Sequence, residues 1–150
     1  MMRIVLGVIV GFIAWMMMWV GSEWIISELW PTGFGVHQRA FQEAIEKGGP
    51  FSADRTMLLV HLVLGAMVST AAGFLAATIS GENKRAPLGL GVLLLAMGIA
   101  KMALSWPYVP LWYHVIFTGL LMPLAILGGK LRGGTPSNAV SSKVHERDKP

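Results

Sequence analysis

Residues 56–80, TMLLVHLVLGAMVSTAAGFLAATIS, decide the fold, because this stretch contains no Asp, Glu, Lys or Arg. A helix needs about 20 predominantly apolar residues to cross the hydrocarbon core of a bilayer. Stretches of similar length and composition occupy residues 4–22, 86–106 and 107–129. Since 54% of the 150 residues are hydrophobic and only 13% are charged, the sequence predicts an integral membrane protein and excludes an ordinary soluble domain.

The links on either side of the third stretch are short. Residues 81–87, GENKRAP, join it to the second stretch, which makes these two spans antiparallel neighbours. Residues 106–110, WPYVP, contain two prolines, which stop one helix and start the next. We therefore predict an all-α, integral membrane four-helix bundle in one domain of residues 1–132, with spans at about 4–29, 56–80, 86–106 and 109–130.

The first stretch begins close to the initiator methionine, so a cleaved secretory signal peptide is the competing interpretation. Its apolar run is longer than the usual core of a signal peptide and includes the bulky Trp15 and Trp19. Apolar helical character also continues from Trp24 to Trp30, beyond the small residues where cleavage would fall. We therefore interpret this stretch as a membrane span that is kept.

The distribution of Lys and Arg predicts the orientation, because short loops rich in these residues stay in the cytoplasm. With both termini inside, eight of the twelve basic residues are cytoplasmic, which predicts an N-in, C-in topology. The net charge of +4 follows from this topology, because the surplus of basic residues in the tail faces anionic lipid of the inner leaflet. It gives no reason to expect nucleic-acid binding. The cytoplasmic set is Arg3, Lys84, Arg85, Lys130, Arg132, Lys143, Arg147 and Lys149, and the outer set is Arg39, Lys47, Arg55 and Lys101.

Two segments lie outside the predicted spans. In the first and longest loop, residues 36–47 predict an amphipathic helix on the outer surface, with one apolar face made of Val36, Ala40, Phe41, Ala44 and Ile45. Residues 133–150 have too little apolar surface to offset the entropy of the chain. We predict that they form a disordered cytoplasmic tail.

Small residues recur at positions that favour close packing between helices. In lipid the hydrophobic effect does not drive one helix against another, so association relies on residues that let backbones approach. In the second span such residues recur at every fourth position and therefore share one face. The predicted packing residues are Gly7 and Gly11 in the first span, Gly65, Ser69 and Gly73 in the second, and Gly91 and Gly98 in the third.

Four ionisable residues, one from each span, are the candidate functional residues: Glu23, His61, Lys101 and His114. With a rise of about 1.5 Å per residue, all four fall in the outer half of the bilayer. Charged groups inside a bilayer are costly and mark candidate functional sites. We therefore predict a polar cluster just below the outer surface, in which Glu23 faces either the bundle or the lipid headgroups.

Three interpretations of this cluster compete. In the first, Lys101 and Glu23 snorkel or pair, and the histidines bond across helices to fix the register of a structural or accessory subunit without a cofactor. In the second, His61 and His114 face each other from diagonal helices as axial ligands of a haem, or hold a divalent metal together with Glu23. In the third, Glu23, His61 and His114 change protonation state in a small proton- or ion-coupled transporter.

The sequence offers no positive support for catalysis. It contains no cysteine, and it lacks a phosphate-binding loop and a dinucleotide-binding glycine pattern. No serine or threonine has an evident base and orienting group beside it. We therefore expect a non-enzymatic protein, with the first interpretation leading, whose partners are the lipid bilayer and either a second copy or another membrane protein.

The chain also resembles a known group of proteins in three short motifs. Residues 110–114, PLWYH, and 128–132, GGKLR, open and close the fourth span, and residues 11–15, GFIAW, lie in the first. With these motifs the chain resembles small four-span bacterial inner-membrane proteins of unknown function over residues 1–132. The resemblance implies a bacterial inner-membrane location and four helices, and it implies no activity, ligand or partner.

Overall fold

The structure of this chain is a computed structural model that describes residues 1–133. Its helices are α1 (Met2–Leu29), η1 (Pro31–Gly35), α2 (Val36–Lys47), α3 (Arg55–Ser80), α4 (Arg85–Ser105) and α5 (Leu111–Gly133), where η1 is one short π-helical turn. Of the predicted tail, only Gly133 lies within the described residues, and it ends α5. The prediction for the rest of the tail lies outside them.

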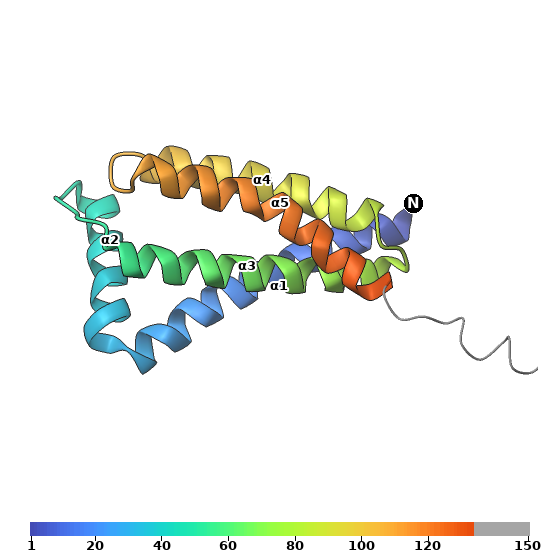
Figure 1. The fold of residues 1–150 in the computed structure, drawn as a ribbon, viewed down its shortest axis with the longest axis horizontal. Helices are drawn as coiled ribbons and strands as arrows, with labels where there is room; N and C mark the ends of the chain where they lie inside the picture. The colour runs from blue at the N-terminus through green and yellow to red at the C-terminus, as the bar shows by residue number, and fades with distance from the viewer. Residues whose placement is uncertain (134–150) are drawn as a thin grey trace, which may run out of the picture.

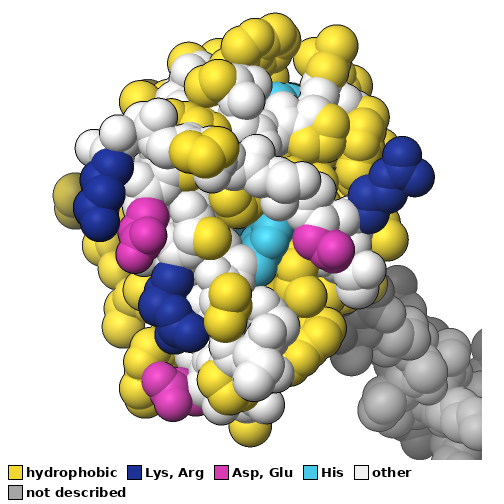
Figure 2. Space-filling view, turned by 90° about the vertical axis from the view of Figure 1, so that its left-hand side faces the viewer, with side chains coloured by type: hydrophobic (Ala, Val, Ile, Leu, Met, Phe, Trp, Pro, Cys, Tyr) yellow, Lys and Arg dark blue, Asp and Glu magenta, His cyan; other side chains and the backbone are white. Residues whose placement is uncertain are grey.

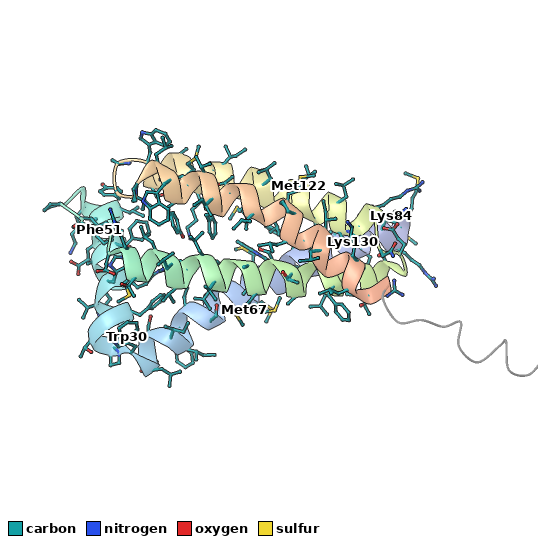
Figure 3. All side chains as sticks on the ribbon, viewed as in Figure 1. Trp30, Phe51, Met67, Lys84, Met122 and Lys130 are labelled. Carbon is teal, nitrogen blue, oxygen red and sulfur yellow. The ribbon has the colours of Figure 1, made fainter. Side chains whose placement is uncertain are left out.

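Four of these helices, α1, α3, α4 and α5, are long and apolar enough to cross a membrane. Large side chains such as Met67 (Figure 3) are exposed on their outer faces, as lipid requires, and so is Leu104. No strand occurs in residues 1–133. The predicted all-α four-helix membrane bundle is therefore confirmed, together with the extra helix in its first loop.

Helix α3 is the central element of the bundle. It packs most extensively on α5 and next on α1, while α4 packs on α5 and less closely on α1 and α3 (Figure 1). The second and fourth spans are therefore direct neighbours, and the expectation that they lie on a diagonal was wrong. The short link, residues 81–84 in the structure, does join α3 and α4 as touching helices, but their contact is smaller than those that α3 makes with α1 and α5.

Helix α2 lies across one end of the bundle, which we call the α2 end (Figure 1). The opposite end, called the far end, holds the N-terminus, the α3–α4 link and the end of α5. Helix α3 starts at the α2 end, where a carboxylate oxygen of Asp54 accepts hydrogen bonds from the backbone N–H groups of Thr56 and Met57. Gly48 and Gly81 end α2 and α3 in the left-handed conformation that glycine adopts without steric cost.

Backbone contacts at small residues hold α3 against α5. A methyl group on Gly73 would collide with the backbone of Ala125, and one on Gly128 would collide with the backbone of Thr70. Both contacts require glycine, because any side chain would push the two helices apart. The α3–α5 interface therefore has the closest backbone approach in the described bundle.

The same kind of contact joins α1 to α3. A methyl group on Gly7 would lie 2.7 Å from the carbonyl oxygen of Ala76, and one on Gly11 would lie 2.9 Å from the Ala76 side chain. Further along, the indole N–H of Trp15 donates a 3.0 Å hydrogen bond to the buried hydroxyl of Ser69. These residues fix the rotation of α1 about its axis and turn Trp15 and the next-turn Trp19 toward α3.

The remaining predicted packing glycines lie against side chains. A methyl group on Gly91 would approach Met122 on α5, and one on Gly98 would lie 2.8 Å from Leu121. At Gly65 the same group would lie 2.8 Å from the ring of Phe117. These contacts let α4 and α5 approach each other, and they make room for an aromatic ring beside α3.

Replacing Gly73 by Ala should destabilise the bundle, because the added methyl group meets backbone atoms of Ala125 that cannot move out of the way. Overpacking of this kind costs about 1–3 kcal/mol. The matched control is Gly119→Ala on α5, where a methyl group meets open space and helix propensity improves. Thermal unfolding in detergent should therefore show a loss for the first variant only, and equal effects would contradict the packing described.

Candidate functional site

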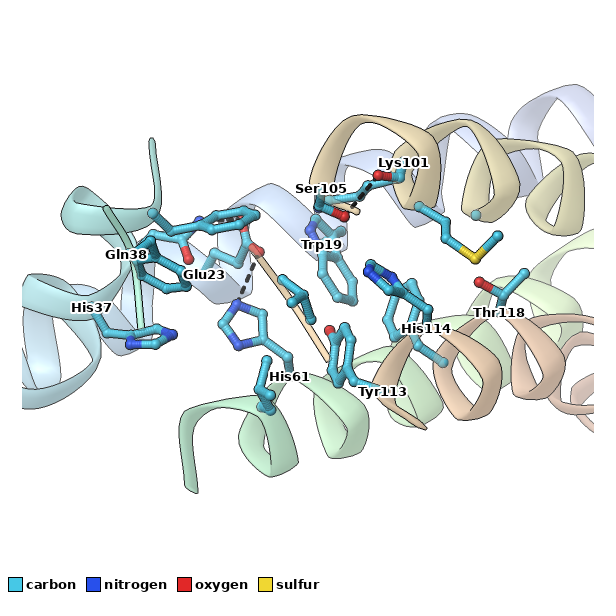
Figure 4. Close-up of a pocket in the computed structure, with 17 residues that line it drawn as sticks. Trp19, Glu23, His37, Gln38, His61, Lys101, Ser105, Tyr113, His114 and Thr118 are labelled. Atoms are coloured by element: carbon cyan, nitrogen blue, oxygen red, sulfur yellow. Dashed lines mark hydrogen bonds and ion pairs between the residues drawn. The ribbon is translucent and has the colours of Figure 1, made fainter. Parts of the chain in front are cut away.

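A cavity of about 60 Å³ lies inside the α2 end, between the spans and α2 (Figure 4). About four water molecules fit in such a volume, at roughly 15 Å³ each. Every helix except η1 contributes to its lining. Its polar and aromatic residues include Trp19, Glu23, His37, Gln38, His61, Lys101, Ser105, Tyr113, His114 and Thr118.

All four candidate residues from the sequence line this one cavity: Glu23 from α1, His61 from α3, Lys101 from α4 and His114 from α5. Glu23 points toward His61 and thus toward the bundle interior, which decides between the two orientations left open by its helical position (Figure 4). Figure 2 shows the surface of this end, where acidic, basic and histidine side chains lie among apolar ones.

Glu23 and His61 form an ion pair in the cavity wall. The Nε2 atom of His61 lies 3.5 Å from Oε1 of Glu23, and the amide of Gln38 donates to Oε2 of Glu23 at 3.5 Å. The Nδ1 atom of His61 lies 2.8 Å from the carbonyl oxygen of Met57, one helical turn earlier in α3. Both ring nitrogens of His61 therefore have partners.

The contact with Met57 fixes the tautomer of His61. A carbonyl oxygen only accepts, so Nδ1 must carry the hydrogen and donate it. Nε2 then faces the Glu23 carboxylate with a lone pair unless one of the two groups is protonated there. The Glu23 carboxylate therefore has contacts from both His61 and Gln38.

The ring of His61 stacks against the ring of Phe34. The two rings stack with centroids 4.8 Å apart, and Phe34 is fully buried. Because Phe34 belongs to η1, this contact ties the short turn after α1 to the start of α3. The sequence reasoning missed Phe34, since a single aromatic residue between glycines has no periodic pattern to mark it as buried.

Lys101 lies beside an aromatic column instead of an acidic group. Its Nζ atom is 5.1 Å from the ring centroid of Trp19, which stacks on Trp15 and meets Phe117 edge-on. Within residues 1–133 the ion pairs include Glu23 with His61 and none with Lys101. Of the two arrangements expected for Lys101 and Glu23, the direct pair is absent from this described region.

Two buried nitrogen atoms in the cavity wall have no hydrogen-bond partner among the described residues: Nε1 of Trp19 and Nε2 of His114. Trp19 is 5% exposed and His114 is 4% exposed. The ring of His114 is also held in place, because it stacks on Trp106 with centroids 5.8 Å apart. Buried polar atoms are nearly always paired, so two orphans beside one cavity indicate a place for polar atoms of another molecule.

The haem and metal interpretations do not fit this arrangement. Pockets for organic ligands of moderate size measure about 300 Å³ or more, whereas this cavity measures about 60 Å³. Both ring nitrogens of His61 are already engaged by Met57 and Glu23. In residues 1–133 no three His, Asp or Glu side chains gather closely enough to hold a metal ion.

His37 brings a further titratable group to the cavity from α2. Burial lowers the pKa of His37 below its ordinary value, and the charge of His61 lowers it further, whereas Asp54 raises it. The pKa of Asp54 is itself lowered, chiefly by the hydrogen bond from the backbone of Met57. His37 is therefore neutral over most of the physiological range, and the charge on Asp54 partly offsets the effect of burial.

Comparisons with protein-family models, with curated proteins and with solved structures find no match for this chain. The chemistry of the site is therefore inferred from its own residues.

The pKa of His37, measured by NMR titration in detergent micelles, should lie below the value of about 6.5 found in unfolded peptides. Asp54→Asn should lower it further, because asparagine keeps the helix cap but removes the negative charge. Glu46→Gln is the control, since Glu46 does not contribute to the His37 pKa.

The same shift links His37 to stability. Because its pKa is lower in the folded state, the contribution of neutral His37 is fully present above about pH 6.5 and is lost as the pH falls through the interval down to the folded pKa. His37→Gln should flatten this acid-side loss. A His37 pKa above that of a free histidine would contradict the burial of this side chain.

Proposed function

We propose that this chain is a non-enzymatic accessory protein of the bacterial inner membrane whose working part is the cavity at the α2 end. One observation supports this proposal above others: the ionisable groups within the spans gather around one cavity at the α2 end, and apolar side chains fill the interior of the rest of the bundle. In the middle and far half of the bundle, the fully buried residues Ala72, Ala76, Leu90, Leu94 and Ala125 fill the interior. Such an arrangement suits a protein that binds a ligand or partner at one face of the membrane only.

The hydroxyl groups along the spans support a non-enzymatic role. Those of Thr70, Thr78 and Ser105 donate to carbonyl oxygens of their own helices, one turn earlier. That of Ser69 accepts from Trp15. These hydroxyls bond to backbone carbonyls or to Trp15, and none has a hydrogen bond to a histidine or carboxylate that could activate it as a nucleophile.

The proposed orientation places the α2 end on the periplasmic side and both termini in the cytoplasm. The far end carries Arg3, Lys84, Arg85 and Arg132, and the guanidinium of Arg132 donates a 2.6 Å hydrogen bond to the carbonyl of Ala77 near the end of α3. Basic residues in short loops favour the cytoplasmic side. The cavity then opens toward the periplasm, at the level of the outer headgroups.

A transport role would require a polar path across the bundle. No such path is present in this conformation of the described bundle. Buried apolar residues fill the interior between the cavity and the far end, and backbone contacts at Gly73–Ala125 and Gly128–Thr70 close it further. The cavity that holds Glu23 and His61 is therefore separated from the far end by packed apolar residues. This asymmetry favours binding over transport.

Thiol labelling tests the orientation and the cavity together, because the chain has no cysteine of its own. Met102→Cys, in the cavity wall, should react with a charged, membrane-impermeant thiol reagent added to the periplasmic side. The matched control is Leu104→Cys on the same helix, which is 72% exposed on the lipid face and should stay unreactive because lipid suppresses thiolate formation. Lys84→Cys should react only after the membrane is permeabilised.

Two results would contradict the proposal. Labelling of Lys84→Cys from the periplasm would reverse the orientation. A proton flux in vesicles that contain the purified chain, abolished by His61→Ala, would establish the transporter interpretation instead.

A further inference from the structure

We propose that the cavity binds the ionised carboxylate of a single-chain amphiphile, a long-chain fatty acid, with its acyl chain in the surrounding lipid. This inference rests on the proposed function, in that it takes the cavity at the α2 end as the working part, and it names the chemical class of the ligand. Four features of the cavity support this inference: its unpaired hydrogen-bonding groups, its charge, its size and its opening.

The unpaired donors define the polar part of the ligand. The indole N–H of Trp19 can only donate, so its partner must be an acceptor. Nε2 of His114 can donate or accept, and the His114 side chain lines the same cavity as Trp19. Two acceptor atoms on one ligand, such as the two oxygens of a carboxylate, would pair with both nitrogens. Both side chains are more than nine-tenths buried, so each unpaired atom has lost water that a ligand must replace.

The charge of the cavity favours an anion. Glu23 is already engaged by His61 and by Gln38, each at 3.5 Å, and within residues 1–133 no ion pair joins it to Lys101. Lys101 remains as a cation next to Trp19, with its Nζ 5.1 Å from the ring centroid. An ammonium group at this depth in a membrane protein needs a counter-charge or access to the headgroup level. A carboxylate hydrogen-bonded to Trp19 would supply that counter-charge.

The size of the cavity selects a carboxylate over a phospholipid headgroup. The two oxygens of a carboxylate occupy about the space of two water molecules, and about four fit in 60 Å³. A glycerophosphate with its ester groups is several times larger. A single-chain amphiphile can therefore seat its head in the cavity, while a two-chain lipid cannot.

The opening of the cavity provides the route for the acyl chain. Lys101 lines the cavity and is also exposed, so the cavity reaches the outer face of α4 at this residue. Leu104, next along that helix, is exposed to lipid. Met102 and Phe117 also line the cavity and offer apolar contact to the first methylene groups. An amphiphile enters from the outer leaflet, head first, without crossing water.

Thermal unfolding of the purified full-length chain in detergent tests the inference with three probes: dodecanoate, dodecanol and acetate. Dodecanoate should raise the midpoint in a concentration-dependent manner. Dodecanol has the same chain without the carboxylate, and acetate has the carboxylate without the chain, so both should bind at least about tenfold more weakly. Dodecanoate should also protect Met102→Cys from the thiol reagent.

Two substitutions test the assigned contacts. Lys101→Met removes the cation, and Trp19→Phe keeps an aromatic ring but removes the N–H donor. Each should weaken dodecanoate binding by about tenfold or more, because a hydrogen bond or ion pair to a charged group is lost. Lys130→Met, a lysine at the far end, is the matched control and should bind as the wild type does. The unfolding midpoints without ligand show whether each variant is folded.

The outcomes separate this inference from the proposed function. Equal binding of dodecanoate and dodecanol, or binding unaffected by Lys101→Met and Trp19→Phe, would overturn the carboxylate assignment. Acetate that binds as tightly as dodecanoate would show a site for soluble carboxylates and overturn the amphiphile. If Met102→Cys is labelled from the periplasm but no probe binds, only the proposed ligand class is wrong. If Met102→Cys is not labelled, the proposed function of the cavity is contradicted as well.

Discussion

The close approach of α3 to α1 and α5 is the constraint on which the rest of the structure depends. Lipid supplies no hydrophobic force between helices, so contact between backbones must stabilise the bundle. Gly73 and Gly128 allow that contact between α3 and α5, and Gly7 and Gly11 allow it between α1 and α3. With α1 and α5 fixed against α3, the rotation of each of these helices about its axis is also fixed, and so is the direction of the polar side chains that they carry.

The same constraint explains why the cavity lies at only one end. Toward the far end, small residues meet backbone atoms and leave no space. Toward the α2 end, the pattern along α3 changes from Gly73 and Ser69 to Gly65 and His61, and the neighbouring helices contribute the large rings of Trp19 and Phe117. Rings of this size hold the helices apart and leave a space between them, where the ionisable groups gather. Packing and polar chemistry thus occupy different halves of one bundle.

Much of this arrangement can be predicted from the sequence. The lengths of the apolar stretches give the four spans, the four-residue spacing of small residues gives the packing face of α3, and the rise per residue gives the common depth of Glu23, His61, Lys101 and His114. These features depend on helix geometry alone. For that reason they follow from one sequence without any knowledge of how the helices are ordered.

The order of the helices, and what depends on it, could not be predicted in the same way. Link length suggests which spans are neighbours, but the glycine contacts place α5 beside α3, which brings His114 to the same wall as Trp19. The role of Gly128 was missed because it stands next to another glycine and basic residues, where it looks like a helix end. The unpaired nitrogens of Trp19 and His114 depend on side-chain positions that no spacing rule supplies.

The central claim is that packing around α3 brings ionisable groups from separate helices into one cavity, and the distance between Glu23 and His61 tests it most directly. Solid-state NMR on the chain in lipid bilayers can measure the dipolar coupling between Nε2 of His61 and the carboxyl carbon of Glu23. The account predicts strong coupling, in keeping with the 3.5 Å contact between Nε2 and Oε1. The absence of measurable coupling in folded protein would show that α1 does not turn Glu23 toward α3, and would contradict the account.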